Sequence, residues 1–286
     1  MLIVELNGGL GNQMFQYALY KKLLSMNKEV YLYDAILTKK LNNPSSVKIF
    51  DVFDLDYKIC DKHECYVRAD VRRDIFSRLR RRIFGKRKFH TNYIETDFDN
   101  NYDMKIFNLN DAYIQGYWQS ELYFREIKDK IRKEFSFSYI DMCEIGDILN
   151  KIDNTNSVSI HVRRGDYVGN PIYSGICTKE YYEKAICKIY DRISEPFFFI
   201  FSDDIEYVKG LFRNKNFYIV NKFNGMEAHY DMFLMSKCQH NILANSSFSW
   251  WGAWLNDHKD KMVISPKRWA NTIELRHTPC KDWIRI

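Results

Sequence analysis

The chain has 286 residues, of which 46% are hydrophobic and 16% aromatic, so it can bury a sizeable core and is not a disordered protein. Its net charge of +6 suits an anionic small molecule, a membrane surface or a nucleic acid as a partner. Seven cysteines, an odd number without a C-x-x-C pair, argue against a disulfide framework and against a zinc ribbon.

The first predicted unit is a strand, a glycine-rich turn, a helix and a second strand. Leu2 to Leu6 and Val30 to Tyr33 have strand character, and Gln13 to Met26 carries an apolar helical face. This order predicts a parallel α/β sheet, and we expect neither a signal peptide nor a membrane span at its start. The turn, Asn7 to Asn12, lacks the G-x-G-x-x-G spacing, so a nicotinamide site is not expected. Its glycines instead indicate close approach by a ligand or a neighbouring element.

A strongly basic stretch lies in the next, less regular part of the chain, after a loop at Asn42 to Ser46. Arg68 to Lys88 carries ten Lys and Arg against Asp70 and Asp74, with apolar residues at helical spacing. Two readings compete. The stretch is either a solvated helix with one packed face, the commoner outcome, or a helix that rests on an anionic membrane surface or binds nucleic acid.

Two D-x-D patterns, Asp54-Leu55-Asp56 and Asp97-Phe98-Asp99, have the form of a divalent-cation site. Each lies in a polar loop without a clear preceding strand, and so short a pattern is expected by chance among 37 acidic residues. We therefore assign a metal to neither.

The region around Gly116 predicts a strand from about Asp111 that turns at this glycine, followed by a helix from Ser120 to Glu134. Ser120 is the expected N-cap. Trp118 and Gln119, at the junction, either face a sugar or belong to the core, and both readings stay open.

Strands and helices alternate regularly after the polar segment 137–156, which we interpret as a domain boundary. The pattern predicts five strands with helices between them, and therefore a Rossmann-like domain. The strands are expected at Val158–Val162, Pro196–Phe201, Phe217–Val220, Asn241–Ala244 and Met262–Ser265.

Polar residues follow three of these strands directly. The first ends in His161 to Tyr167, which contains two adjacent arginines; Ser202 to Asp204 follows the second, and Asn245 to Ser249 follows the fourth and opens a helix. Each segment alone has an ordinary reading, as a surface ion pair, a solvated turn or a helix cap. Together, at one sheet edge, they predict a nucleotide-diphosphate pocket, because arginines and helix N-termini bind phosphate. Asp203 is placed to accept hydrogen bonds from a guanine.

Several segments resemble the signature blocks of the α-1,2-fucosyltransferases, in order along nearly the whole chain. The weakest likeness is in the variable part from about 38 to 108. The blocks are Asn7–Tyr17, Gly116–Glu121, His161–Tyr167 with its H-x-R-R-x-D motif, Phe201–Asp204, Asp231–Cys238 and Asn245–Leu255.

The resemblance implies a GT-B fold, with two Rossmann-like domains facing a cleft. Residues 1–150 would form the acceptor-side domain, with a variable basic insertion at about 38–108, and residues 151–286 the GDP-sugar-binding domain. The implied reaction moves L-fucose from GDP-β-L-fucose to O2 of a terminal galactose with inversion, without a metal or other cofactor. It would serve surface-glycan or O-antigen type synthesis on a galactose-containing or lipid-linked glycan. The expected location is cytoplasmic, peripheral to the inner membrane face, with no nucleic-acid partner.

The resemblance also implies roles for individual residues. Arg163 would hold the β-phosphate of the leaving GDP, with Arg164 and with Asp166 orienting the arginines, and fixed cations there would lower the barrier to leaving-group departure. Asn12 would face the cleft, but an amide is no base, so the general base stays open. The remaining donor-side residues are His161, Asp203, Asn245, Ser246, Ser247 and Phe248, and the acceptor-side ones are Gly9, Gln13, Trp118 and Gln119.

Three alternatives stay open from the sequence. The first is a transferase of another GDP-sugar. The second is a metal-dependent glycosyltransferase that uses Asp97 and Asp99. The third is a non-enzymatic protein that binds an anionic surface or nucleic acid through Arg68 to Lys88.

Overall fold

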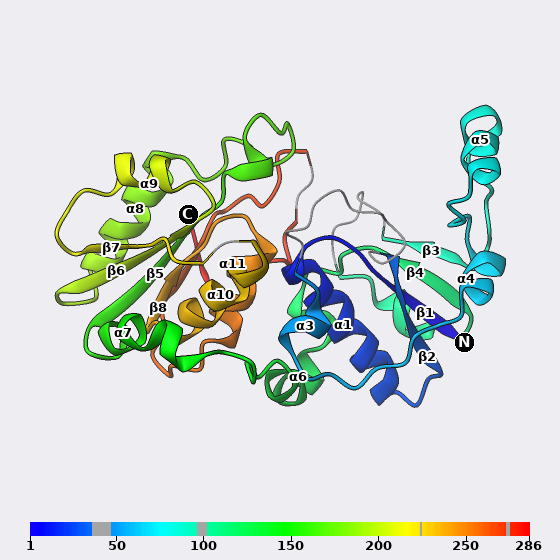
Figure 1. Cartoon of the computed structure of the whole chain (residues 1–286), viewed down its shortest axis with the longest axis horizontal. Helices are drawn as coiled ribbons and strands as arrows, with labels where there is room; N and C mark the ends of the chain where they lie inside the picture. The colour runs from blue at the N-terminus through cyan, green and yellow to red at the C-terminus, as the bar shows by residue number, and fades with distance from the viewer. Residues whose placement is uncertain (36–46, 96–101, 224, 273–274) are drawn as a thin grey trace.

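The computed structural model describes residues 1–35, 47–95, 102–223, 225–272 and 275–286. These residues form two parallel α/β sheets, with a group of helices between them (Figure 1). The predicted α/β fold class is therefore confirmed. The loop at Asn42 to Ser46 and the pattern Asp97-Phe98-Asp99 lie outside the described residues.

The first sheet has the strand order β2-β1-β4-β3, with every pair parallel. The central strand β1 is fully buried because its run of apolar residues is covered on both faces. The strands are β1 (Leu2–Leu6), β2 (Val30–Asp34), β3 (Asn92–Ile94) and β4 (Ala112–Gln115). The accompanying helices are α1 (Leu10–Ser25), α3 (Ile49–Val52), α4 (Lys62–Arg68), α5 (Ile75–Phe84) and α6 (Lys128–Glu134), with short 3-10 turns at Met104–Asn108, Glu121–Tyr123 and Arg125–Ile127.

The second sheet has the order β10-β9-β8-β5-β6-β7, again all parallel. The five predicted strands are present, and a sixth, too short to show a sequence pattern, joins the edge at β10. The strands are β5 (Asn156–Val162), β6 (Pro196–Ser202), β7 (Phe217–Val220), β8 (His240–Ile242), β9 (Val263–Ser265) and β10 (Ile284–Arg285). The helices are α7 (Met142–Asp153), α8 (Lys179–Tyr190), α9 (Ile205–Leu211), α10 (Ala228–Lys237) and α11 (Ser247–Leu255), with 3-10 turns at Gly165–Tyr167 and Gly225–Glu227.

Two predicted elements differ from the structure. The helix expected from Ser120 to Glu134 is broken into two 3-10 turns before α6, because Phe124 leaves helical geometry at φ −140° while its side chain is fully buried. Ser120 does act as a cap, since its hydroxyl accepts from the backbone N–H of Leu122.

The polar segment 137–156, predicted as a domain boundary, contains helix α7. Ile145, Ile148 and Ile152 are buried on one face of α7, and the helix contacts β5 and α10. Because α7 packs with the second sheet, we propose that the two domains divide ahead of Met142 and not at residue 150.

An aromatic cluster joins the two domains. Phe15 of α1 lies 4.5 Å from Trp250 and 4.9 Å from Trp251 of α11, between ring centroids, and Phe124 stacks on Trp251 at 5.5 Å. The indole N–H of Trp251 donates to the carbonyl of Gly11 at 2.9 Å. Since these rings are fully buried, the two domains share one hydrophobic core. This core fixes the position of one domain relative to the other, and with it the two walls of the cleft.

Among the described residues, no helix combines the length and apolar character needed to cross a bilayer.

Candidate active site

A cleft of about 820 Å³ lies between the two domains, a size typical of small-ligand sites. Both halves of the chain line it. The first domain contributes, among others, Gly8, Gly9, Asn12, Tyr93, Glu95, Asp103, Lys105, Tyr117, Trp118 and Gln119, and the second Asp166, Tyr167, Tyr173, Asn245, Ser247 and Trp269.

Arg163 is held at the end of β5 between two carboxylates. Its Nη1 pairs with Asp203 Oδ2 at 2.8 Å, and its Nη2 with Asp166 Oδ1 at 2.6 Å. Burial disfavours the charge, but Asp203 and Asp166 outweigh it and raise the pKa of the guanidinium. The side chain is 35% exposed, so the cation is fixed by the protein and still reachable by a ligand.

Asp203 organises both arginines from the end of β6. Its Oδ1 accepts from the backbone N–H of Arg164 at 2.8 Å, while its Oδ2 pairs with Arg163. A Cβ at Gly165 would lie 2.6 Å from Asp203 Oδ2, so any larger residue there would displace this carboxylate oxygen. Both carboxylate oxygens thus serve the arginines, and the contact of Asp203 with a guanine stays a prediction.

Arg164 points to a different partner. Its Nε donates to Asp204 Oδ2 at 3.2 Å, and its guanidinium lies 3.9 Å from the ring centre of Tyr207. The two adjacent arginines therefore pair with different carboxylates. Arg163 is the one that pairs with Asp166, which lines the cleft.

Two helix N-termini meet in the wall of the cleft. Helix α11 begins after Ser246, whose Oγ accepts from the N–H of Phe248, and α1 begins after Gly9, which has no side-chain cap. A Cβ on Gly11 would lie 2.6 Å from the backbone of Ser247, so the two helix starts are in direct contact. Since a helix N-terminus carries partial positive charge and unpaired N–H groups, this junction favours an anion.

Of the predicted donor-side residues, His161 and Phe248 pack beside each other, and Asn245 lines the cleft. His161 is buried, its ring lies 5.7 Å from that of Phe248, and burial together with Arg163 lowers its pKa to about 3, so the ring is neutral. Asn245 donates from its side-chain amide to the carbonyls of Tyr173 and Trp269, at 3.3 and 3.2 Å. These contacts fix the loop between β8 and α11.

The acceptor-side predictions divide into two groups. Asn12 Oδ1 accepts from Gln119 Nε2 at 2.7 Å, and both line the cleft with Gly9 and Trp118. Gln13 does not line it. Its buried amide donates to the carbonyls of Gly8 and Val47 and accepts from the N–H of Ile49, so its contacts in this structure are with the backbone and its acceptor-side role stays a prediction.

Glu95, Asp103 and Lys105 also lie in the cleft wall and were not predicted from the sequence. Glu95 Oε2 accepts from the N–H of Tyr117 at 2.7 Å, and both of its oxygens lie 3.2 Å from the N–H of Trp118. Asp103 accepts from the hydroxyl of Tyr93 and from the N–H of Lys105. The three-residue strand β3 and the 3-10 turn at Met104–Asn108 that place them give no periodic signal in the sequence.

Comparison with known proteins gives a consistent result. The family model for glycosyl transferase family 11 matches residues 1–286. The O-antigen biosynthesis glycosyltransferase WbnK of Escherichia coli is 35% identical over 312 residues, covering 98% of this chain and 99% of that protein. An α-1,2-colitosyltransferase of Escherichia coli is also 35% identical, over 302 residues, covering 100% of this chain and 99% of that protein.

A solved structure is similar in fold. It is the NodZ α-1,6-fucosyltransferase soaked with GDP-fucose, with a TM-score of 0.52 and 16% identity, covering 89% of this chain and 91% of that one. At this identity the likeness concerns the fold alone, which is the GT-B arrangement of two α/β domains around a cleft.

Proposed function

The chain belongs to glycosyl transferase family 11, and one relative similar over its full length is named as an α-1,2-colitosyltransferase. We propose that this chain moves L-fucose from GDP-β-L-fucose to O2 of a terminal galactose, with inversion. The observation that carries the proposal is Arg163, a cation that is fixed by Asp203 and pairs with Asp166, a residue lining a cleft that two helix N-termini approach. This is the electrostatic environment that a departing nucleoside diphosphate needs.

Of the two carboxylates that pair with Arg163, Asp166 is the one that a bound phosphate can displace. Asp166 is 69% exposed, whereas Asp203 is 28% exposed and is also held by the N–H of Arg164. The β-phosphate of the donor therefore replaces Asp166 on Nη2, while Asp203 keeps the guanidinium in place. An arginine prepositioned in this way stabilises the charge that develops on the diphosphate without reorganising during the reaction.

The acceptor hydroxyl has to approach from the other wall of the cleft. Inversion requires attack on the face of the sugar opposite the leaving group, and the leaving group lies with Arg163. Among the described residues of the opposite wall, the carboxylates lining the cleft are Glu95 and Asp103. We assign the base to Glu95, because two backbone N–H groups fix its carboxylate, whereas Asp103 already accepts from a tyrosine hydroxyl.

GDP-colitose is a second candidate donor, favoured by the full-length likeness to an α-1,2-colitosyltransferase. Colitose lacks the 3-hydroxyl of fucose. A pocket that hydrogen-bonds this hydroxyl rejects the deoxy sugar strongly, by about 10⁴-fold, because a buried polar group would otherwise be left unpaired.

The acceptor in this proposal is a galactose-containing oligosaccharide carried on a lipid, and the reaction takes place on the cytoplasmic side of a membrane. The likeness to an O-antigen biosynthesis glycosyltransferase supports this choice.

A donor and acceptor screen tests the proposal. The purified protein is incubated with GDP-fucose or GDP-colitose and a panel of β-galactosides, with and without chelator, and the product linkage is determined by NMR. We expect chelator-resistant transfer of fucose to O2 of galactose. Transfer of colitose with no fucose product would replace the donor, and loss of activity in chelator would remove the metal-free mechanism.

Glu95→Gln and Asp103→Asn then separate the two carboxylates. The proposal expects a fall of about 10² to 10⁴-fold in kcat for Glu95→Gln, with GDP binding unchanged. A kcat that falls only in Asp103→Asn would move the base to that residue.

A further inference from the structure

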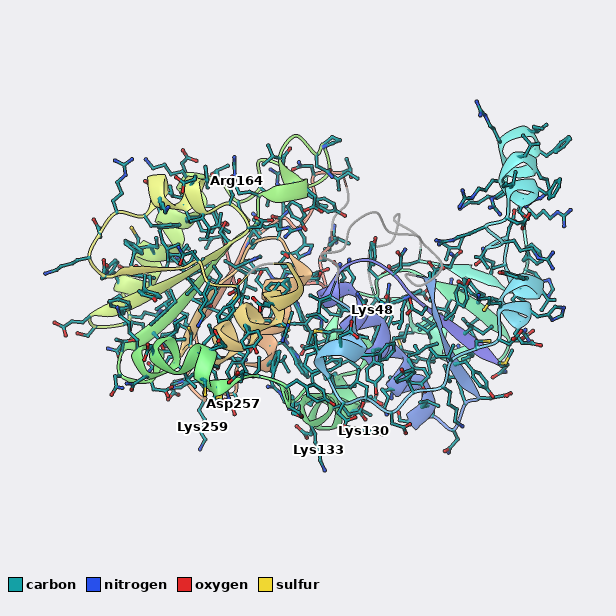
Figure 2. The ribbon with its side chains drawn as sticks, viewed as in Figure 1. Lys48, Lys130, Lys133, Arg164, Asp257 and Lys259 are labelled. Carbon is teal, nitrogen blue, oxygen red and sulfur yellow. The ribbon has the colours of Figure 1, made fainter. Side chains whose placement is uncertain are left out.

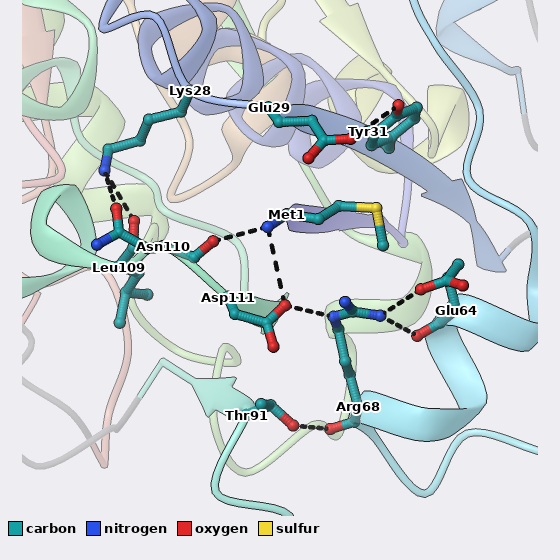
Figure 3. Close-up of polar contacts among 10 residues, drawn as sticks. All are labelled: Met1, Lys28, Glu29, Tyr31, Glu64, Arg68, Thr91, Leu109, Asn110 and Asp111. Atoms are coloured by element: carbon teal, nitrogen blue, oxygen red, sulfur yellow. Dashed lines mark hydrogen bonds and ion pairs between the residues drawn. The ribbon is translucent and has the colours of Figure 1, made fainter.

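Residues 69–90, here called the basic arm, leave the first domain and return to it at neighbouring points. Helix α5 lies in this arm and projects beyond α4 and β3, away from both sheets (Figure 1). The root is firmly attached (Figure 3): Thr91 Oγ1 donates to the carbonyl of Arg68 at 2.9 Å, and the Arg68 guanidinium pairs with Glu64 and Asp111, each at 2.6 Å. These hydrogen bonds and ion pairs therefore fix the base of the arm to the first domain.

Helix α5 exposes its apolar side chains. No residue of the helix is buried. The exposed fractions are 79% for Ile75, 84% for Phe76, 55% for Leu79, 62% for Ile83 and 81% for Phe84. Four of these, Ile75, Phe76, Leu79 and Ile83, share one face at helical spacing. An apolar face of this kind normally packs on the core of its own domain, so its exposure points to a partner.

The arm holds α5 by its charged face instead. Asp70 accepts from the guanidinium groups of Arg80 and Arg81 and from the backbone N–H of Arg87. At 100° per residue, Arg81 lies opposite the apolar face and Arg80 beside it. This attachment turns the hydrophobic side of α5 outward, the reverse of ordinary helix packing.

Unneutralised cations lie along one border of the apolar face and in the segment that follows the helix. Arg78, Arg82, Lys86 and Lys88 are exposed, and in the part of the chain that the structure describes none of them has a carboxylate within ion-pair distance. Arg78 and Arg82 lie along one border of the apolar face. A surface with apolar side chains at its centre and cations at its border matches the boundary between lipid headgroups and acyl chains.

We propose that α5 docks this protein on an anionic lipid bilayer, with Phe76 and Leu79 inserted at the headgroup boundary and Arg78 and Arg82 on lipid phosphates. A nucleic acid would use the cations but leaves the five exposed hydrophobic side chains without a role. A second copy of the chain would bring two sets of cations together, which charge repulsion disfavours. The anionic bilayer satisfies both features at once.

The basic arm and the loop after β5 lie on the same side of the molecule. In the view of Figure 2, α5 and Arg164, which follows Arg163, lie toward one long edge of the molecule, and Lys130 and Lys133 lie at the opposite edge. The inference deepens the proposed function, on which it rests for its purpose, because a docked arm brings the cleft to an acceptor carried on lipid.

Vesicle co-sedimentation of the full-length protein tests the proposal. One set of vesicles contains phosphatidylcholine with phosphatidylglycerol, and the other phosphatidylcholine alone. The variants are Phe76→Ser with Leu79→Ser, for the apolar face, and Arg78→Glu with Arg82→Glu, for its charged border. The matched control, Lys130→Glu with Lys133→Glu, makes the same charge change on exposed residues of α6.

We expect binding to the anionic vesicles, with affinity falling as salt rises, and a loss of about tenfold or more in each arm variant. The control should stay within about twofold of the wild type. Transfer to a soluble galactoside should be unchanged in every variant, which shows that the fold is intact. It also separates this inference from the proposed function, since a protein that binds vesicles without transferring fucose contradicts only the latter.

Three results would overturn the inference. Equal binding to neutral vesicles would remove the role of the cations. Wild-type binding by the serine variant would remove the role of the apolar face. A dimer in light scattering that this variant converts to a monomer would assign the face to a second copy of the chain.

Discussion

Gly11 lies against the backbone of the second domain, and replacing it with alanine tests whether the cleft depends on that contact. A Cβ at residue 11 would lie 2.6 Å from the carbonyl carbon of Ser247 and 2.7 Å from the N of Phe248. Ordinary contact begins near 3.4 Å, so α1 and α11 would have to separate by 3.4 − 2.6, or about 0.8 Å. The neighbouring atoms are backbone, so no side chain can rotate away.

The expected result of Gly11→Ala is a loss of about 1–3 kcal/mol in the free energy of unfolding, the usual range for overpacking. Activity should fall further, by up to about 10²-fold in kcat, because the two walls of the cleft shift by nearly 1 Å relative to each other. Urea unfolding and steady-state transfer measure the two effects.

Gly9→Ala is the matched control for stability. Residue 9 is the N-cap of α1 at φ −74°, and a Cβ there meets nothing within 4 Å, so only the weaker capping preference of alanine should lower the free energy of unfolding, by at most about 1 kcal/mol, and kcat should not show the loss expected for Gly11→Ala. Alanine is the better helix former, so propensity alone would make Gly11→Ala stabilising. A stabilised and fully active Gly11→Ala protein would refute the reasoning.

Three further predictions follow from the same geometry. Trp251→Ala should cost about 3–5 kcal/mol in urea unfolding, because it empties the aromatic core between the domains; a loss below about 1 kcal/mol would contradict a shared core. Burial and Arg163 lower the pKa of His161 from 6.5 to about 3, so between these values the unfolded state binds the extra proton and stability is lost as pH falls through this window. His161→Asn should flatten that part of the pH profile, and an unchanged profile would assign it to other groups. Gly165→Ala places a Cβ 2.6 Å from Asp203 Oδ2 and should weaken GDP binding about tenfold in calorimetry, whereas unchanged affinity would remove Asp203 as the support of Arg163.

The second sheet and its polar loops were predictable because each signal is local. Apolar runs mark β5 and β6, and His161 to Tyr167 and Ser202 to Asp204 follow them directly. Parallel strands bring their carboxyl ends to one edge, so no further information was needed to place these loops together. The pairing of Arg163 with Asp166 was expected from the resemblance to the α-1,2-fucosyltransferases, in which Asp166 would orient the arginines.

Other features depend on contacts between distant parts of the chain. The sequence shows that α5 is basic and amphipathic, but its orientation is set by Asp70, which engages Arg80 and Arg81 through their side chains and Arg87 through the backbone. Glu95 follows a three-residue strand, and its role in the cleft depends on backbone N–H groups more than twenty residues away along the chain. Such contacts leave no periodic pattern in the sequence.

The position of Gln13 also depends on contacts that the sequence alone does not reveal. It lies in a segment that resembles a family block, next to Asn12, which does line the cleft. One step along α1 turns the Gln13 side chain by about 100°, into a buried position where it holds the backbone of Val47 and Ile49. Membership of a block therefore did not distinguish a residue that lines the cleft from one that is buried beside it.

The central claim is that Arg163 binds the β-phosphate of the donor, and a comparison of GDP with GMP tests it most directly. Calorimetry gives the affinities of both nucleotides for the wild type, for Arg163→Ala, and for Lys259→Ala as a remote control that also loses one exposed cation. The account predicts that GDP binds the wild type and the control about 10 to 100-fold more tightly than GMP, the worth of a charge-assisted contact. In Arg163→Ala this difference should disappear while GMP affinity is retained. If Arg163→Ala still prefers GDP by the wild-type factor, another group binds the β-phosphate and the account is wrong.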